Sequence, residues 1–152
     1  ILHKIGDIDM QRVDWKRAIG VYEQIRNLEP ADERARLTLM QLYYRFNRPQ
    51  QAIAEIDALL KTYRDAGKQK RMFTILEDAV REQETDIPLC ARLAQVFLNA
   101  GRAEDALKHL DKLGDLQLAA KRYKEARATV RAIIALNPPN VEEYQKLLGQ
   151  LG

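Results

Sequence analysis

The feature that most constrains this chain is an internal repeat. Residues 2–30 and 110–138 align without a gap, and the two copies share small residues, aliphatic residues and a closing proline. The identical pairs are Leu2/Leu110, Lys4/Lys112, Gly6/Gly114, Asp7/Asp115, Lys16/Lys124, Ala18/Ala126, Ile25/Ile133, Leu28/Leu136 and Pro30/Pro138. Because chance does not produce such spacing, the chain is built from repeated units.

Small and apolar residues recur within each copy at the spacing of an amphipathic helix. Ala18, Tyr22 and Ile25 form one such set, and an equivalent set with the same internal spacing begins at Ala52. The pattern predicts helices over 1–11, 14–28, 32–46, 49–66, 68–84, 87–99, 103–120, 122–136 and 141–151.

Residues at the predicted helix ends support these boundaries. Asn47 and Gly101 stand where a helix should end in a left-handed turn, which both residue types tolerate. Pro49 falls in the first turn of the next helix, where its missing N–H costs nothing. Asn140 and Glu143 have the spacing of a capping box at the start of the last helix.

These positions resemble the tetratricopeptide repeat, a helix–turn–helix unit of about 34 residues. First-helix positions hold Leu2, Ile5-Gly6, Leu39-Met40, Tyr43, Cys90, Leu93-Ala94 and Phe97. Second-helix positions hold Trp15, Ala18, Tyr22, Ile25 and Pro30, then Tyr123, Ala126, Val130, Ile133 and Pro138. The resemblance covers nearly the whole chain. It implies an all-α, antiparallel helix–turn–helix solenoid, wound as a right-handed superhelix of about nine helices.

The spacing departs from a regular array. The positions equivalent to Ala18 are Ala52, Met72, Ala106 and Ala126, so intervals of the family length alternate with much shorter ones. A short interval has room for one helix and a turn, so we expect the helices over 49–66 and 103–120 to be shared between successive repeats. Any groove should then be short or interrupted.

These shared helices define the expected organisation of the chain. We expect one array over 1–152, a piece of a longer protein. Its units should cover about 1–30, 31–84 and 85–138, followed by a C-terminal helix over 141–151.

Composition and motifs argue against catalysis. With 46% hydrophobic and 31% charged residues the chain is an ordinary globular one, and its single cysteine cannot form an internal disulfide. The sequence has no phosphate-binding loop, paired metal-ligand motif or nucleophile elbow. Cys90 should be a buried small residue, and His109 should lie on an exposed helix face. We therefore predict no enzyme activity and no cofactor or metal.

Basic residues raise nucleic-acid binding as an alternative. Two clusters contain Arg34, Arg36, Arg45, Arg48, Lys68, Lys70 and Arg71. Single-strand binders combine such charge with aromatic residues for stacking. Here Tyr43 occupies a core position, so only Tyr44 is available for stacking. The net charge is also only +3. The alternative is therefore disfavoured.

The favoured function is a protein-interaction scaffold, because repeats of this family hold a peptide or partner helix in a concave groove. The groove-facing candidates are Arg34, Thr38, Gln41, Tyr44 and Arg45, with His3, Asp7, Met10, Gln11 and Leu37 as further positions. The Lys and Asn residues with which some family members clamp chaperone tails are absent at the matching positions, so that ligand is not expected.

The last predicted helix suggests self-association. Its apolar residues have no following helix to cover them: Val141, Tyr144, Leu147, Leu148 and Leu151. A solenoid end without a polar cap exposes such a face. Homo-oligomerisation through the terminal helices and a role as a structural spacer are therefore alternatives to the scaffold function. No stretch is long and apolar enough to span a membrane, and we expect a cytoplasmic location.

Overall fold

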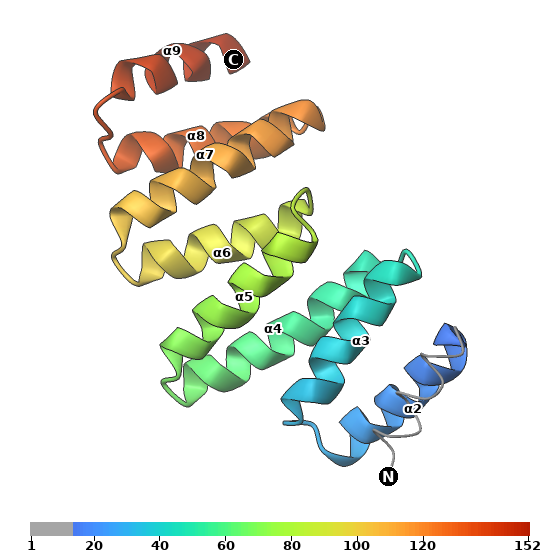
Figure 1. The fold of residues 1–152 in the computed structure, drawn as a ribbon. Coiled ribbons are helices and arrows are strands. Elements are labelled where there is room, and N and C mark those ends of the chain that lie inside the picture. The colour runs from blue at the N-terminus through green and yellow to red at the C-terminus, as the bar shows by residue number, and fades with distance from the viewer. Residues whose placement is uncertain (1–13) are drawn as a thin grey trace. The chain divides into compact units, whose positions relative to one another are not determined.

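The computed structural model describes residues 14–152 and contains eight α-helices and no strand within them (Figure 1). The helix predicted over 1–11 lies outside the described residues. The helices are α2 (Trp15–Leu28), α3 (Glu33–Arg45), α4 (Pro49–Asp65), α5 (Gln69–Glu82), α6 (Ile87–Asn99), α7 (Ala103–Ala119), α8 (Tyr123–Ala135) and α9 (Val141–Leu151). The predicted all-α helix–turn–helix fold is confirmed.

Aspartates define three of the helix starts. The carboxylates of Asp14, Asp32 and Asp86 accept hydrogen bonds from backbone N–H groups three residues later, at 3.2, 3.0 and 3.0 Å. Each bond satisfies an N–H group that the first turn of a helix leaves without a partner. The sequence therefore specifies where α2, α3 and α6 begin.

The left-handed turns predicted after α3 and α6 are confirmed. Asn47 has a φ of 57° and Gly101 a φ of 72°, and Pro49 lies in the first turn of α4. The capping box predicted before α9 is wrong. Asn140 has φ −101° and ψ 34°, and its side chain makes no cap hydrogen bond. Its amide instead donates to the Glu143 carboxylate at 3.3 Å.

The helices recur in threes. Helices α2, α3 and α4 begin at positions 15, 33 and 49, and α5, α6 and α7 begin at positions 69, 87 and 103, a constant distance further along the chain. The same interval leads to α8 and α9, which begin at 123 and 141. We call this distance the repeat interval. Residues separated by it are equivalent in this chain, although most of them differ in identity.

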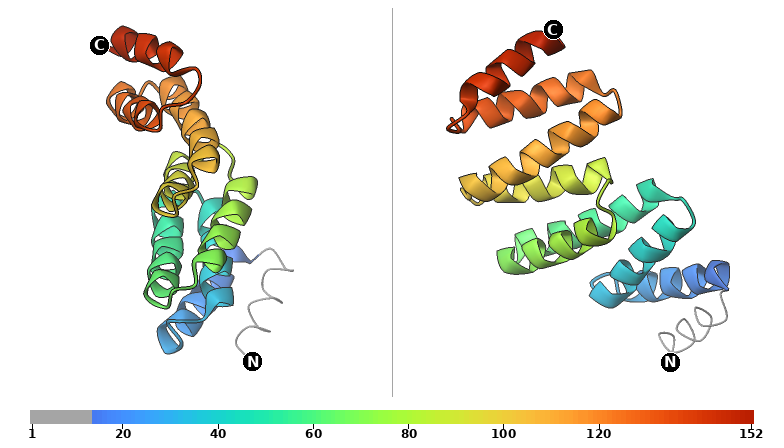
Figure 2. Two further views of the ribbon diagram at one scale, coloured as in Figure 1. Left: turned by 90° about the vertical axis from the view of Figure 1, so that its left-hand side faces the viewer. Right: turned by 45° about the horizontal axis from the view of Figure 1, so that its top comes forward.

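The chain forms two compact units that divide within α5, between Met72 and Phe73. In the described part of the first unit, α3 packs against both α2 and α4 (Figure 2). The largest fully buried side chains there are Tyr22, Leu39, Leu42, Tyr43, Ile56 and Leu59. These residues fill the space between the three helices. Their burial determines which side of α3 stays exposed to solvent.

The second unit continues the same packing. Helix α7 packs against α6 and α8, and α9 packs against α8. Its largest fully buried side chains are Leu76, Leu89, Leu93, Val130 and Ile133. Helix α9 differs from the others in having no buried residue.

Candidate functional site

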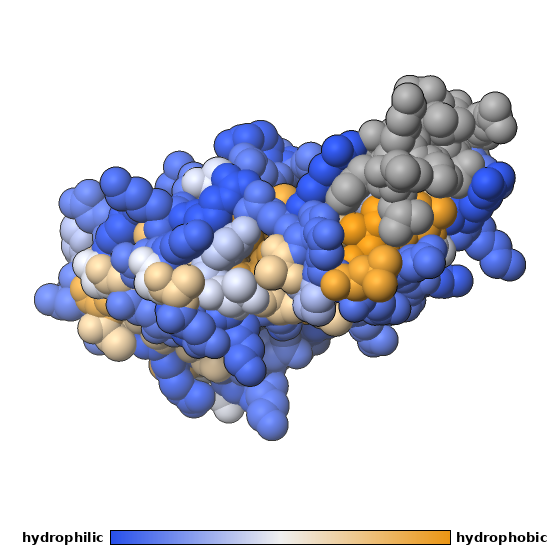
Figure 3. Space-filling model, turned by 90° about the horizontal axis from the view of Figure 1, so that it is seen from below, coloured by the Kyte–Doolittle hydropathy of each residue, from blue (hydrophilic) through white to orange (hydrophobic). Residues whose placement is uncertain are grey.

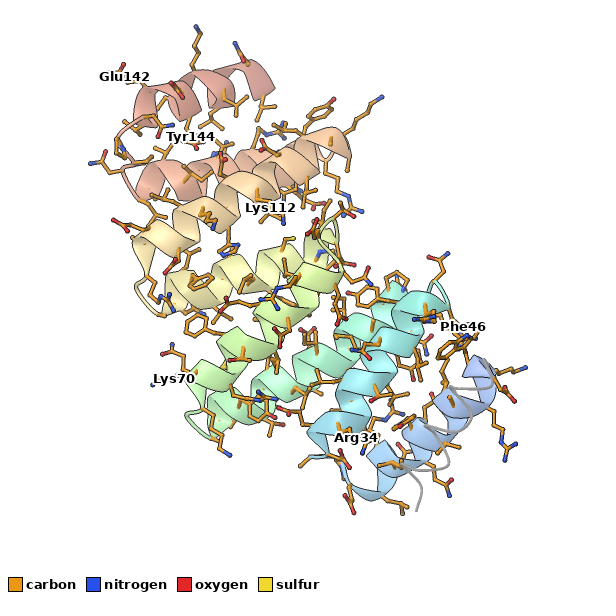
Figure 4. The ribbon with its side chains drawn as sticks, in the orientation of Figure 1. Arg34, Phe46, Lys70, Lys112, Glu142 and Tyr144 are labelled. Carbon is orange, nitrogen blue, oxygen red and sulfur yellow. The ribbon has the colours of Figure 1, made fainter. Side chains whose placement is uncertain are left out.

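One face of α3 carries the predicted groove residues. Arg34, Thr38, Gln41 and Arg45 are spaced by four, three and four residues, which places them on one stripe of the helix. Arg34, Gln41 and Arg45 are exposed, and Thr38 is half-buried. The opposite side of α3 carries the buried residues, and Figure 4 marks Arg34 near the start of the helix. We call these four residues the α3 face.

The α3 face is cationic at both ends. Arg34 stands in its first turn and Arg45 in its last, about 16 Å apart along the axis at 1.5 Å per residue. The guanidinium carbon of Arg45 lies 4.4 Å from the centre of the Trp15 ring, a cation–π contact that orients the side chain. The stripe holds no carboxylate. This arrangement suits an elongated ligand that carries negative charge.

The fifth main candidate, Tyr44, stands apart from the α3 face. Tyr44 is half-buried and lies about 100° around the helix from Arg45. The candidates His3, Asp7, Met10 and Gln11 lie outside the described residues. The structure therefore brings four of the five main candidates together, with Tyr44 at the side.

The basic clusters considered for nucleic-acid binding are divided by ion pairs. Arg36 is 3.0 Å from Glu55, which Arg26 also contacts, and Glu55 is only 4% exposed. Arg71 donates to Glu33 at 2.7 Å, and this hydrogen bond lowers the pKa of Glu33. Since Arg36 and Arg71 serve the packing of α3 against its neighbours, the clusters do not form one continuous basic surface.

The buried carboxylate of Glu55 was not predicted from the sequence. The signal was its place on the apolar stripe of α4, three residues after Ala52 and one before Ile56, both of which are fully buried. A charged residue on such a stripe needs a partner of opposite charge. The partners come from α2 and α3 and are distant in sequence, so spacing alone could not identify them.

Tyr43 lies in the core, as predicted. It is 1% exposed, and its hydroxyl donates to the Glu23 carboxylate at 2.8 Å. Burial, together with this hydrogen bond, raises the pKa of Tyr43 to about 12. The side chain is therefore part of the packing between α2 and α3 and is not available for stacking on a base.

The prediction that His109 is exposed is wrong. Its ring is half-buried and stacks on Phe97, with 4.9 Å between centroids and 5° between planes. The physical reason is that α7 presents this position to α6, where an aromatic ring is available. Burial lowers the pKa of His109, and the neighbouring Lys108 adds to the effect.

Cys90 is buried, as predicted, and burial raises the pKa of its thiol. A buried thiol with a raised pKa is a poor nucleophile. Within residues 14–152 no group of three histidine, cysteine or carboxylate side chains is placed to hold a metal ion. In the same part of the chain, no helix is both long enough and apolar enough to cross a membrane.

Large apolar side chains are exposed at only three described positions. They are Leu28 at the end of α2, Phe46 just after α3 and Tyr123 at the start of α8. The face of the molecule seen in Figure 3 is mainly hydrophilic, with one gathered hydrophobic patch on the right of the view.

The fold and this surface define an all-α helical-repeat protein. Residues 10–71 match the family model described as tetratricopeptide repeat. The resemblance predicted from the sequence is therefore confirmed. Proteins of this family are generally non-catalytic scaffolds that bind other proteins.

The solved structures that match this chain share little sequence with it. MamA is 15% identical, with a TM-score of 0.49 over 97% of this chain and 92% of its own. A tetratricopeptide repeat protein from Parabacteroides merdae is 15% identical, with a TM-score of 0.40 over 99% and 69%. YrrB, described as having an unusual peptide-binding site, is 13% identical, with a TM-score of 0.37 over 94% and 89%. No curated protein matches the chain significantly.

Proposed function

We propose that this chain is a non-catalytic scaffold that binds an extended peptide or a helix of a partner protein at the α3 face. The observation that carries the proposal is the stripe Arg34, Thr38, Gln41 and Arg45, which spans three turns and lies opposite the buried side of α3. Side chains on a rigid helix present fixed hydrogen-bond donors at low entropic cost.

The charge of the first unit favours an acidic partner. Residues 14–72 contain 12 lysines and arginines against eight aspartates and glutamates. Arginine binds carboxylates through paired hydrogen bonds, so Arg34 and Arg45 are suited to acidic groups near the two ends of a bound segment.

The test is capture of partners from a lysate of the source organism after nuclease treatment, with washes at low and high salt. The wild-type chain is compared with the triple variant Arg34→Ala, Gln41→Ala, Arg45→Ala. The matched control is Lys124→Ala, Arg131→Ala, Gln145→Ala, which removes two cations and one amide from exposed positions of the second unit.

We expect a discrete protein that the wild type and the control retain and the α3 triple variant loses. Retention of that protein by all three chains would refute the α3 face as the site. Capture of nucleic acid alone, released by salt or by nuclease, would replace the scaffold with the nucleic-acid alternative. A cytoplasmic location and self-association remain predictions.

A further inference from the structure

Positive charge gathers on α8 in the second unit. Residues 121–135 contain five lysines and arginines and one glutamate, whereas residues 73–120 and 136–152 together contain six lysines and arginines and eleven carboxylates. Four exposed residues of α8, spaced by four, three and four positions, form one stripe of the helix: Lys124, Ala128, Arg131 and Ala135. We call them the α8 stripe. It presents two cations separated by small side chains and contains no carboxylate.

The repeat interval shows that this stripe is an outer surface of the repeat. The equivalent residues of α5 are exposed although further helices follow α5 in the chain: Lys70, Thr74, Glu77 and Arg81. The exposure of the α8 stripe is therefore a property of its place in the repeat. Its charge is what distinguishes it, because Arg131 stands where α5 has Glu77.

A stripe of opposite charge lies on α7. Its four residues have the same spacing as the α8 stripe, and all are exposed: Glu104, Lys108, Asp111 and Asp115. We call them the α7 stripe. Asp111 accepts a hydrogen bond from the hydroxyl of Tyr144 at 2.8 Å (Figure 4). Burial, together with the charge of Asp111, raises the pKa of Asp115.

The charges of the two stripes have no ionic partners within the described chain. Among residues 14–152 the ion pairs of α7 and α8 join Arg102 to Asp105 and Arg122 to Glu125, and none involves a residue of either stripe. The negative charge of the α7 stripe and the positive charge of the α8 stripe are therefore both available for pairing.

Over their full length the two stripes match when the helices run parallel. The facing pairs are then Lys124 with Glu104, Ala128 with Lys108, Arg131 with Asp111, and Ala135 with Asp115. Both cations meet carboxylates, and the aliphatic stem of Lys108 lies against a methyl group. The antiparallel alignment places Arg131 against Lys108, where like charges repel each other.

The two stripes of one molecule cannot meet each other. Helices α7 and α8 pack through their other sides, where the buried Thr129 donates to the side chain of Gln117 at 2.6 Å. Each stripe lies on the opposite side of its helix from the buried residues that make this contact. A stripe that pairs with the α8 stripe in this way therefore belongs to another molecule.

We infer that the α8 stripe of one molecule docks on the α7 stripe of a second copy. The small side chains of Ala128 and Ala135 allow the two helices to approach closely. Because the contact joins two different surfaces, each molecule in a pair keeps one stripe for a further copy, which produces rings or filaments. Nucleic acid is a poorer occupant, because a long polyanion would also meet the net negative charge of the rest of the second unit.

This inference does not rest on the α3 face. The stripes lie on other helices and in the other unit. The control variant in the test of the α3 face lacks both Lys124 and Arg131. A partner protein that this control retains is therefore bound without self-association, so the two proposals stand or fall separately.

The test is sedimentation velocity of the full chain at concentrations up to about 1 mM, at low and at high salt. One variant reverses the α8 stripe with Lys124→Glu and Arg131→Glu, and another reverses the α7 stripe with Glu104→Lys and Asp111→Lys. The matched control makes the same change of net charge at two exposed positions outside the stripes, with Glu82→Lys and Glu84→Lys. Circular dichroism reports whether each variant keeps its helices.

We expect the wild type and the control to form oligomers that grow with concentration and that high salt dissociates. Each reversed variant alone should associate at least about tenfold more weakly, because like charges then face each other. An equimolar mixture of the two reversed variants should associate again, because a glutamate stripe on α8 then meets a lysine stripe on α7.

Three results would overturn the inference. The first is a wild-type chain that stays monomeric at every concentration. The second is a mixture of reversed variants that does not recover association, because the substitutions would then act by some route other than pairing of the stripes. The third is association of the reversed variants alone at wild-type strength, which would assign self-association to another surface.

Discussion

Single residues distinguish the two units at equivalent positions. Glu55 and His109 are separated by the repeat interval and occupy the same place on α4 and α7. In the first unit this place holds a buried carboxylate between Arg26 and Arg36. In the second unit it holds an imidazole stacked on Phe97. The same backbone site therefore supports an ionic network in one unit and an aromatic stack in the other.

Removing the carboxylate should destabilise the first unit. We expect Glu55→Ala to lower the free energy of unfolding by about 2 kcal/mol, because two partly buried arginines lose their counterion. The arginines keep some contact with water, which holds the effect below that of a fully buried pair. Urea denaturation measures it, with Lys61→Ala at an exposed position of α4 as the control for substitution in that helix. A change below about 0.5 kcal/mol would mean that the network adds nothing to stability.

The stack at His109 should make stability depend on pH. Burial lowers its pKa in the folded chain, so the neutral ring is favoured by folding. The stabilisation is complete above the unfolded pKa of about 6.5 and is lost as pH falls through that value towards the folded pKa. We expect His109→Phe to flatten the fall in urea midpoint between about pH 7.5 and pH 5.5. An equal fall in both proteins would show that other groups cause it.

At the scale of the element, caps and turns decide where each helix begins and ends. Asp32 and Asp86 are equivalent, and both cap the helices that follow them. Asn140 stands at the corresponding place before α9 and makes no cap hydrogen bond. A polar residue at the right spacing is therefore insufficient, because its side chain can bond another group, as the Asn140 amide bonds the Glu143 carboxylate.

Because only Asp86 makes a cap hydrogen bond, alanine at Asp86 and at Asn140 should lower the free energy of unfolding by different amounts. Asp86→Ala should lower the free energy of unfolding by about 1 kcal/mol, because the N–H of Leu89 loses its acceptor. Asn140→Ala should change it by less than about 0.3 kcal/mol, because no cap bond is removed. Chemical denaturation of the two single variants makes the comparison. Equal losses would show that Asn140 caps α9 in solution.

At the scale of the whole molecule, burial is unevenly distributed along the chain. Helices α3 and α6 each bury at least five residues. Helix α9 ends the described chain with a polar outer face, a half-buried apolar stripe and no buried residue. In a repeat array, stability is largely a sum over neighbouring contacts, so the end with the least burial should open first.

Amide hydrogen exchange tests this gradient. We expect the amides of α9 to exchange at least about tenfold faster than those of α6 under native conditions, because opening α9 exposes little buried surface. Protection of α9 equal to that of α6 in the free chain would contradict the predicted order of opening.

The sequence by itself determined the eight described helices and, to within two residues, their boundaries, because apolar spacing and turn residues act over a few neighbouring positions. It also identified Tyr43 and Cys90 as buried and placed Arg34, Thr38, Gln41 and Arg45 on one helical stripe. Only the tertiary structure decided the partners of Glu55 and the half-buried place of His109. These depend on contacts between helices that are distant along the chain, where a charge finds its counterion or a ring its neighbour only after packing.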